Sequence, residues 1–183
     1  MTTPESAPRH SVRQARGDDV APCHCIESAG FPDTEAAPHT SIEVRQHQFP
    51  EGFLVIEVDG AIAGFVNTGC TDHVELEDEA FKEMVGHDSR GSEMVIFSIA
   101  VTPELQGTGL SVLLMNATID RARELGKQCL QLLCKSPLVR YYERYGFCDQ
   151  GLSGSQHGGA SWHAMCLTLD SPANDSKPRS MGR

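Results

Sequence analysis

The residues best suited to chemistry form a glycine-containing turn, 106–111, which reads Gln-Gly-Thr-Gly-Leu-Ser. The start of a helix leaves backbone N–H groups without partners, and the helix dipole favours negative charge there. Glycine removes the side chains that would keep a phosphate away from the backbone. The turn therefore predicts a pyrophosphate cradle, and an ordinary strand-to-helix turn is the structural alternative.

The sequence on either side of the turn predicts the elements that position it. An apolar run, 94–101, comes before it, and the run after it has helical periodicity. The periodic apolar positions are Leu110, Leu113, Leu114, Ala117, Ala122 and Leu125. The order is thus strand, turn and helix. Other nucleotide motifs do not fit, because the chain has neither a G-x-G-x-x-G fingerprint nor a P-loop.

The rest of the chain predicts further alternation of strands and helices. Asp59-Gly60 separates two β-rich runs and predicts a hairpin. Asp18 or Asp19 is expected to cap the first helix. The expected strands cover 11–15, 53–58, 62–66, 93–102, 129–134 and, after one more strand, 161–169. The expected helices cover 18–29, 33–48 with a break at Pro38, a short stretch near Met84, 109–125 and 138–145. The segment 69–92 is predicted to be a polar surface excursion.

Composition restricts the class of protein. The 183 residues are 39% hydrophobic, which suits one domain, predicted at 11–170 between disordered tails at 1–10 and 171–183. The net charge of −10 argues against nucleic-acid binding and favours a cationic substrate. No apolar run is long enough to span a membrane, so no membrane partner is expected. An odd number of cysteines, seven, without an export signal predicts a cytoplasmic location.

The cysteines are predicted to be structural. Cys129, Cys134 and Cys166 lie in apolar runs and are expected to be small core residues. The run 23–25, Cys-His-Cys, raises the question of zinc. Adjacent ligands suit a tetrahedral site poorly, however, and no C-x-x-C pair supplies the other ligands. We therefore predict no metal site.

Two motifs together carry a resemblance to a known superfamily. The 106–111 turn resembles the Q/R-x-x-G-x-G/A motif of the GNAT N-acetyltransferases, although Ser111 departs from the usual final residue. The segment 142–147, Tyr-Glu-Arg-Tyr-Gly-Phe, resembles the Y-x-x-x-G-F box after their fifth strand. Within the superfamily, most of 12–169 is similar to the arylalkylamine N-acetyltransferases. The resemblance implies an α/β GNAT fold, with a mixed, mostly antiparallel sheet flanked by helices.

The same resemblance implies acetyl-coenzyme A as cosubstrate and assigns residues to it. Ile99, Ala100 and Val101 would pair with the acetyl-pantetheine arm. The pyrophosphate would be held by Gln106, Gly107, Thr108, Gly109, Leu110, Ser111 and Val112. Lys135 and Arg140 are further candidates for contacts with the coenzyme phosphates.

The resemblance also implies catalytic residues. Tyr142 falls on the tyrosine that protonates the departing thiolate, and its alternative role is a core aromatic. The histidine pair of the vertebrate enzymes falls on Val95 and Phe97, which cannot carry a proton. Glu27 on the first helix is then the candidate base, with a solvated surface glutamate as its alternative. His157 is the rival base, or else a turn residue.

The sequence thus predicts acetyl-coenzyme A-dependent acetylation of a small primary amine, either an arylalkylamine or a polyamine, by direct attack. Acetylation of a protein amino terminus or lysine is the alternative reaction. A module that binds acyl-coenzyme A without turnover is the alternative from another class. Substrate identity is expected to reside in the loops 31–50 and 69–92.

Overall fold

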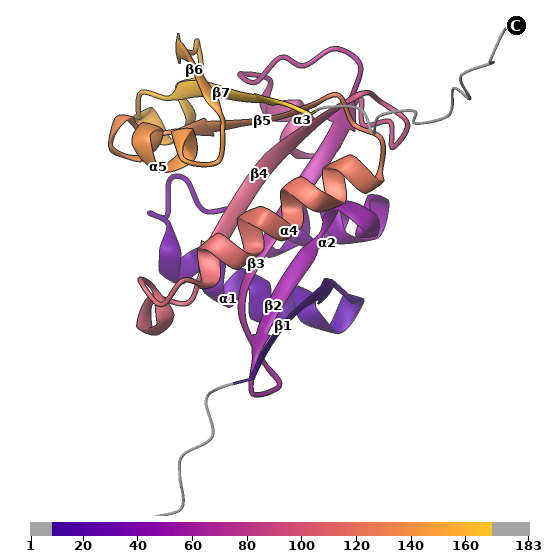
Figure 1. The fold of residues 1–183 in the computed structure, drawn as a ribbon, viewed down its shortest axis with the longest axis vertical. Helices are drawn as coiled ribbons and strands as arrows, with labels where there is room; N and C mark the ends of the chain where they lie inside the picture. Colours follow the sequence, from indigo (N-terminus) through magenta and orange to yellow (C-terminus); the bar gives the residue numbers. More distant parts are fainter. Residues whose placement is uncertain (1–8, 170–183) are drawn as a thin grey trace, which may run out of the picture.

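The computed structural model describes residues 9–169, which form a seven-stranded sheet with the strand order β1-β2-β3-β4-β5-β7-β6 (Figure 1). The strands are β1 (His10–Gln14), β2 (Leu54–Val58), β3 (Ala61–Thr71), β4 (Glu93–Val101), β5 (Cys129–Cys134), β6 (Cys148–Leu152) and β7 (His163–Thr168). The helices are α1 (Val20–Gly30), α2 (His39–Gln48), α3 (Glu79–Lys82), α4 (Leu110–Glu124) and α5 (Val139–Glu143). Apart from residues 9 and 10, the predicted tail 1–10 lies outside the described residues, as does 171–183.

The predicted order of elements is confirmed, and so is the mixed, mostly antiparallel sheet. Only β4 and β5 pair in parallel, and every other pair of neighbouring strands is antiparallel. The hairpin forms at Asp59 and Gly60, both with positive φ, of 50° and 84°. No helix in the described part of the chain is long and apolar enough to cross a membrane.

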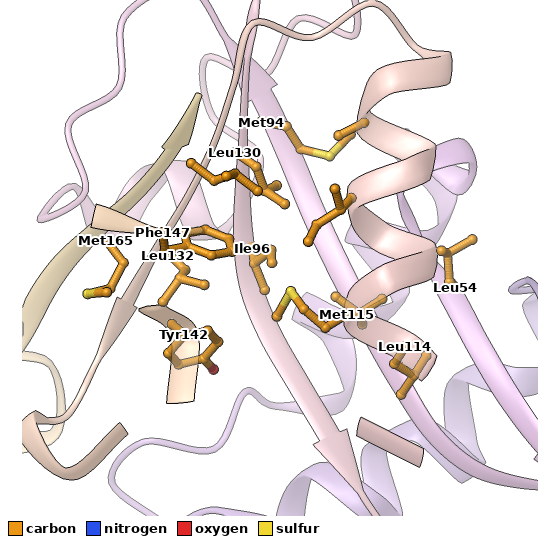
Figure 2. Packing of buried hydrophobic residues seen from close by; sticks show 14 of the residues in the cluster. Leu54, Met94, Ile96, Leu114, Met115, Leu130, Leu132, Tyr142, Phe147 and Met165 are labelled. Carbon is orange, nitrogen blue, oxygen red and sulfur yellow. The ribbon is translucent and has the colours of Figure 1, made fainter. Parts of the chain in front are cut away.

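Helices cover both faces of the sheet because apolar residues alternate along its strands. On β2, Leu54 and Ile56 join the cluster under α4, whereas Val55 joins the cluster under α1 and α2. The α4 side is filled by Leu114 and Met115, both fully buried (Figure 2). Each such side chain contributes about 1.5–3 kcal/mol when it leaves water. This packing holds α4, and the turn before it, in place against the sheet.

Two features of the central strand β4 open a cleft beside it. Asn67 of β3 pairs with Ser98 and Thr68 pairs with Ile96, so Phe97 is an extra residue, a β-bulge. The parallel pairing with β5 extends only as far as Ile96. Beyond that residue β4 and β5 separate, and β5, β6, β7 and α5 form the upper left of the view in Figure 1.

Some local predictions were wrong. Asp19 occupies the position before α1, but its side chain makes no capping hydrogen bond to that helix and instead binds Arg13 at 2.6 Å. The polar excursion begins later than expected, because residues 69–71 continue β3 as strand paired with β4. Of the three cysteines expected in the core, Cys134 is buried, but Cys129 and Cys166 are only half-buried. Both alternate with buried residues along their strands, Cys129 with Leu130 and Cys166 with Met165 and Leu167, so they lie on the less buried face of the sheet.

Candidate functional site

The cleft beside β4 contains two adjoining cavities. The first, which we call the deep cavity, has a volume of about 220 Å³ and lies between the bulge of β4, the end of β5 and the segments 31–45 and 76–83. The second, the turn cavity, measures about 390 Å³ and lies between β4 and the 106–111 turn. Both cavities are lined by Phe31, Ile99, Leu138 and Tyr142, so they meet at these residues.

The 106–111 turn presents a row of unused backbone donors. The N–H groups of residues 107 to 111 have no acceptor among the described residues. Gly107 and Gly109 have φ values of 76° and 93°, a conformation that favours glycine. A Cβ at either position would meet nothing within 4 Å, so the space in front of the backbone is open. Together with the N-terminal dipole of α4, this geometry suits an anion such as pyrophosphate.

Side chains of the turn hold its shape rather than fill the cavity. Gln106 Nε2 donates to the Val101 carbonyl at 3.3 Å, and Thr108 Oγ1 donates to the Leu105 carbonyl at 2.6 Å. Val112 is the first residue after the row whose N–H is used, since it donates to Gly109 O at 3.1 Å.

The residues predicted to hold the coenzyme are distributed around the turn cavity. Its lining includes six of them: Ile99, Ala100, Val101, Gln106, Gly107 and Ser111. Thr108, Gly109, Leu110 and Val112 are not part of the lining, and the Leu110 side chain is in the core. The edge of β4 at 99–101 has β3 on one side and no paired strand on the other, so it can bind an extended amide chain.

Tyr142 lies where the two cavities meet. Its ring packs against Phe147, with centroids 5.9 Å apart, and Figure 2 shows it below Leu132. The residue is 7% exposed, yet its hydroxyl has no hydrogen-bond partner within 9–169. Burial raises the pKa of Tyr142, so the phenol keeps its proton at neutral pH. An unpaired hydroxyl on a cavity wall can donate that proton to a bound molecule.

Glu27 is a buried carboxylate on the wall of the deep cavity. It is 2% exposed, because α1 packs against β3 and β4. Its Oε2 accepts from Ser98 Oγ at 2.6 Å, and its Oε1 accepts from the Ala37 N–H at 2.9 Å. Burial raises the pKa of Glu27, while these hydrogen bonds and the charge of Arg45 act against the rise. The geometry contradicts the alternative of a solvated helix glutamate.

The rival base, His157, also lines the deep cavity, in the turn between β6 and β7. Its Nδ1 lies 3.1 Å from Glu79 Oε2, and its Nε2 lies 3.0 Å from the Glu35 carbonyl. Both ring nitrogens thus face oxygen acceptors, which leaves neither free to take a proton from a ligand. Its contacts instead fasten the segment around Glu35 over the cavity.

The remaining predicted residues lie around the same cleft. Val95 and Phe97 form part of the deep-cavity wall and contribute no titratable group. Lys135 is engaged by Glu35 at 2.6 Å and lies over the Trp162 ring at 5.5 Å. Arg140 is on α5. Within residues 9–169, no group of three or more His, Cys, Asp or Glu side chains could hold a metal ion.

Sequence reasoning missed several polar residues of the deep cavity, among them Ser98 and Arg45. Ser98 was passed over although it lies next to Phe97 on the central strand, and it is the hydroxyl that binds Glu27. Arg45 is 4% exposed and comes three residues after the buried Ile42, a helical spacing that indicates a shared face. That spacing was the available signal for Arg45. Both loops expected to carry substrate identity, 31–50 and 69–92, do contribute to the lining.

Comparison with known proteins finds a family model, described as the acetyltransferase (GNAT) family, that matches residues 22–147. An uncharacterized N-acetyltransferase of Methanocaldococcus jannaschii is 28% identical over 100 residues, 53% of this chain and 39% of the relative. A mycothiol acetyltransferase of Sanguibacter keddieii is 29% identical over 162 residues, 80% of this chain and 48% of the relative. The chain thus spans less than half the length of these curated relatives.

Solved structures share the fold at low identity. The loading GNATL domain of CurA from Lyngbya majuscula superposes with a TM-score of 0.80 and 15% identity, covering 87% of this chain and 98% of that one. A GNAT family acetyltransferase from Brucella melitensis in complex with acetyl-CoA gives a TM-score of 0.59 at 18% identity, with 88% and 89% covered. At these identities the likeness concerns the fold alone.

Proposed function

This chain belongs to the acetyltransferase (GNAT) family, and we propose that it transfers the acetyl group of acetyl-coenzyme A to a small primary amine. The observation that carries the proposal is the joined pair of cavities. One is bordered by free backbone amides, the other contains the buried Glu27, and Tyr142 stands between them.

The turn cavity supports binding of a coenzyme. The five free amides of residues 107–111 supply donors for pyrophosphate, and the lining of the turn cavity contains no lysine among the described residues, which suits a protein of net charge −10. The unpaired edge of β4 at 99–101 leads from this turn toward Tyr142 and the deep cavity. Bound there, acetyl-coenzyme A supplies a thioester at the meeting point of the cavities.

The deep cavity supports chemistry on an amine. An amine reacts as a nucleophile only after it has lost a proton, and Glu27 is placed to accept that proton because each of its oxygens keeps a lone pair. Nitrogen attack forms the N–C bond of the amide and breaks the C–S bond of the thioester, and the nitrogen releases its second proton, which balances the proton that the leaving sulfur takes up. The Tyr142 hydroxyl holds the proton that the leaving sulfur needs. Backbone groups released by the bulge at Phe97 support the developing oxyanion.

The walls of the deep cavity favour an amine that carries an aromatic or apolar group. Phe31, Phe81, Phe97 and Trp162 contribute aromatic surface. Carboxylates line the cavity as well, and a cationic amine is attracted to them before it is deprotonated. We therefore place arylalkylamines ahead of polyamines among the candidate substrates. The relative named a mycothiol acetyltransferase supports a small-molecule acceptor.

The deciding experiment offers the protein acetyl-coenzyme A with phenylethylamine, tryptamine, spermidine and a peptide, and measures thiol release. We expect turnover with at least one aromatic amine, and a loss of that turnover in Tyr142→Phe. Tight binding of acetyl-coenzyme A in calorimetry without thiol release from any acceptor would instead identify a binding module. Turnover of the peptide alone would establish the protein-acetylating alternative.

A further inference from the structure

The deep cavity contains a buried cation, Arg45, that has no ion-pair partner in the described part of the chain. Arg45 lines the cavity and is 4% exposed. No carboxylate among the described residues forms an ion pair with it. Burial lowers the pKa of Arg45, and the more distant carboxylates of Glu27 and Glu83 offset only part of that shift. Buried charges are usually paired, so this one is suited to an anionic partner that residues 9–169 do not supply.

The hydrogen bonds of Arg45 hold its guanidinium in place through Nε and Nη1, and Nη2 makes none with the described residues. Nε donates to the Lys82 carbonyl at 2.9 Å, and Nη1 donates to Asn67 Oδ1 at 3.3 Å. The guanidinium lies 5.0 Å from the centre of the Phe97 ring. Nη2 has no partner within 9–169, and it is not among the fully enclosed polar atoms, so it keeps contact with open space. The open space that Arg45 lines is the deep cavity.

Three of the other charged side chains that line the cavity are already paired. Glu35 binds Lys135, and Glu79 binds both Lys82 and His157. Glu27 receives hydrogen bonds only from a hydroxyl and a backbone N–H.

Glu83 likewise receives hydrogen bonds only from the Ser41 hydroxyl. Asp78, which also lines the cavity, accepts only the Ala80 N–H. Among the described residues, the cavity thus offers one unpaired cation, Arg45, beside three carboxylates without an ion pair. A ligand with both signs of charge complements this set, whereas a polyamine would bring only positive charge to Arg45.

We propose that the acceptor is a free α-amino acid, with its amino group at Glu27 and its carboxylate at the guanidinium of Arg45. The proposal rests on the proposed function, because it names the substrate of the same transfer. A guanidinium forms charge-assisted hydrogen bonds with a carboxylate. The aromatic walls at Phe31, Phe81 and Phe97 suit an apolar or aromatic side chain. Arg45 then acts as a specificity-determining residue.

Ligands that differ only in the carboxylate measure its contribution to binding. Phenylalanine, phenylalaninamide and phenylethylamine share a ring and an amine, and only the first carries the charge that Arg45 would bind. Calorimetry in the presence of coenzyme A, which has no acetyl group to transfer, measures their affinities without turnover. We expect phenylalanine to bind at least about tenfold more tightly than phenylethylamine, with the amide close to the amine. Tyrosine with tyramine, and tryptophan with tryptamine, extend the test to larger rings.

Two substitutions at Arg45 separate charge from packing. Arg45→Met keeps the length of the side chain and removes the charge, so phenylalanine should lose about 10–100-fold in affinity while phenylethylamine loses much less. Arg45→Lys keeps a charge without the planar fork and should fall between the two. Unchanged binding of coenzyme A at the turn cavity serves as the folding control. If both variants unfold, the preferences of the wild-type protein still decide.

The outcomes distinguish this inference from the function on which it rests. A wild-type protein that acetylates phenylethylamine as well as phenylalanine, with no carboxylate preference in any pair, overturns the amino-acid assignment and leaves amine acetylation standing. Binding of phenylalanine that depends on Arg45, without acetylation of any ligand, refutes the transfer and keeps the carboxylate site. Failure of every amino acid to bind overturns the inference outright.

Discussion

At the scale of single residues, the site depends on two polar groups placed where burial changes their chemistry. The Tyr142 ring packs among apolar side chains, and its hydroxyl has no hydrogen-bond partner among the described residues. Glu27 is a carboxylate enclosed between α1 and the sheet. Both arrangements are unfavourable for stability in isolation, because a buried polar group costs free energy unless it is fully bonded. Perturbed groups of this kind concentrate at functional sites.

Tyr142→Phe tests the proton donor. The ring and its contact with Phe147 are retained, so the fold and coenzyme affinity should change little. Loss of the hydroxyl should lower turnover by about 10²–10⁴-fold, the usual contribution of general acid catalysis. Steady-state kinetics and calorimetry on the same preparation provide the comparison. A loss below about threefold would mean that Tyr142 only packs.

Glu27→Gln tests the proton acceptor. The amide can still bond with Ser98 and Ala37, but it cannot take a proton from the amine. Turnover at neutral pH should fall by about 10²–10⁴-fold and recover in part at alkaline pH, where neutral amine becomes abundant. The exposed Glu43 on α2 offers a matched control, since Glu43→Gln removes a carboxylate that is not part of the cavity lining. A wild-type rate and pH profile in Glu27→Gln would exclude Glu27 as the base.

At the scale of elements, the turn before α4 offers its backbone N–H groups as donors. The glycines therefore matter there, because they have no side chain to cover those groups. Gly109 precedes α4 with a φ of 93°, and Gly126 follows the same helix with a φ of 68°. A Cβ would meet no atom within 4 Å at either position. The two glycines therefore differ in location while their backbone demands are alike.

Gly109→Ala and Gly126→Ala form a matched pair of variants. Each forces alanine into a left-handed conformation and should lower the free energy of unfolding by about 1–2 kcal/mol. Only Gly109→Ala puts a methyl group in front of the free amides of residues 107–111, so it alone should weaken coenzyme binding. Denaturant unfolding and calorimetry measure the two effects separately. Equal coenzyme affinity in both variants would contradict the phosphate cradle.

Elements were predictable where their signals are local. The strand at 129–134 and the hairpin at Asp59-Gly60 follow from short patterns of residue type, and the structure confirms both. The bulge at Phe97 and the separation of β4 from β5 depend on pairing between distant strands, which no local pattern specifies.

The candidate site shows the same division. The glycine turn and Tyr142 could be predicted from short motifs. The turn requires glycine at fixed positions, and Tyr142 begins the Y-x-x-x-G-F segment. The burial and hydrogen bonding of Glu27 could not be predicted from the sequence. They depend on Ser98, 71 residues away, and on Ala37 beyond the end of α1. The position of Arg45 in the cavity wall could not be predicted either, because it depends on which face of α2 is turned toward the cavity.

At the scale of the whole molecule, buried carboxylates affect stability in opposite directions. Arg13 joins β1 to the start of α1 through Asp19 and to β2 through Glu57, each at 2.6 Å. The hydrogen bond from Arg13 lowers the pKa of Asp19, so this contact stabilises the fold above the ordinary value of 3.8 and is lost in acid. Glu27 has a raised pKa instead, and its ionisation opposes folding.

The free energy of unfolding of Glu27→Gln should therefore exceed that of the wild type by a margin that grows with pH. Native Glu27 holds its proton more tightly than the unfolded chain does. Its contribution to stability is thus complete below the ordinary pKa of 4.5 and is lost as the pH rises through the raised native value. Glutamine does not titrate, so the free energy of unfolding of the variant does not fall in this way. A functional residue that lowers the stability of the fold is a common trade-off in enzymes.

Urea unfolding of both proteins at pH values from about 4 to 8 measures the margin, and Glu43→Gln is the control for the loss of an exposed carboxylate. A margin for Glu27→Gln that stays flat over the same range would show that burial does not raise the pKa of Glu27. The carboxylate would then be no better a proton acceptor than one at the surface, and the argument for Glu27 as the base would fail even if the variant were slow.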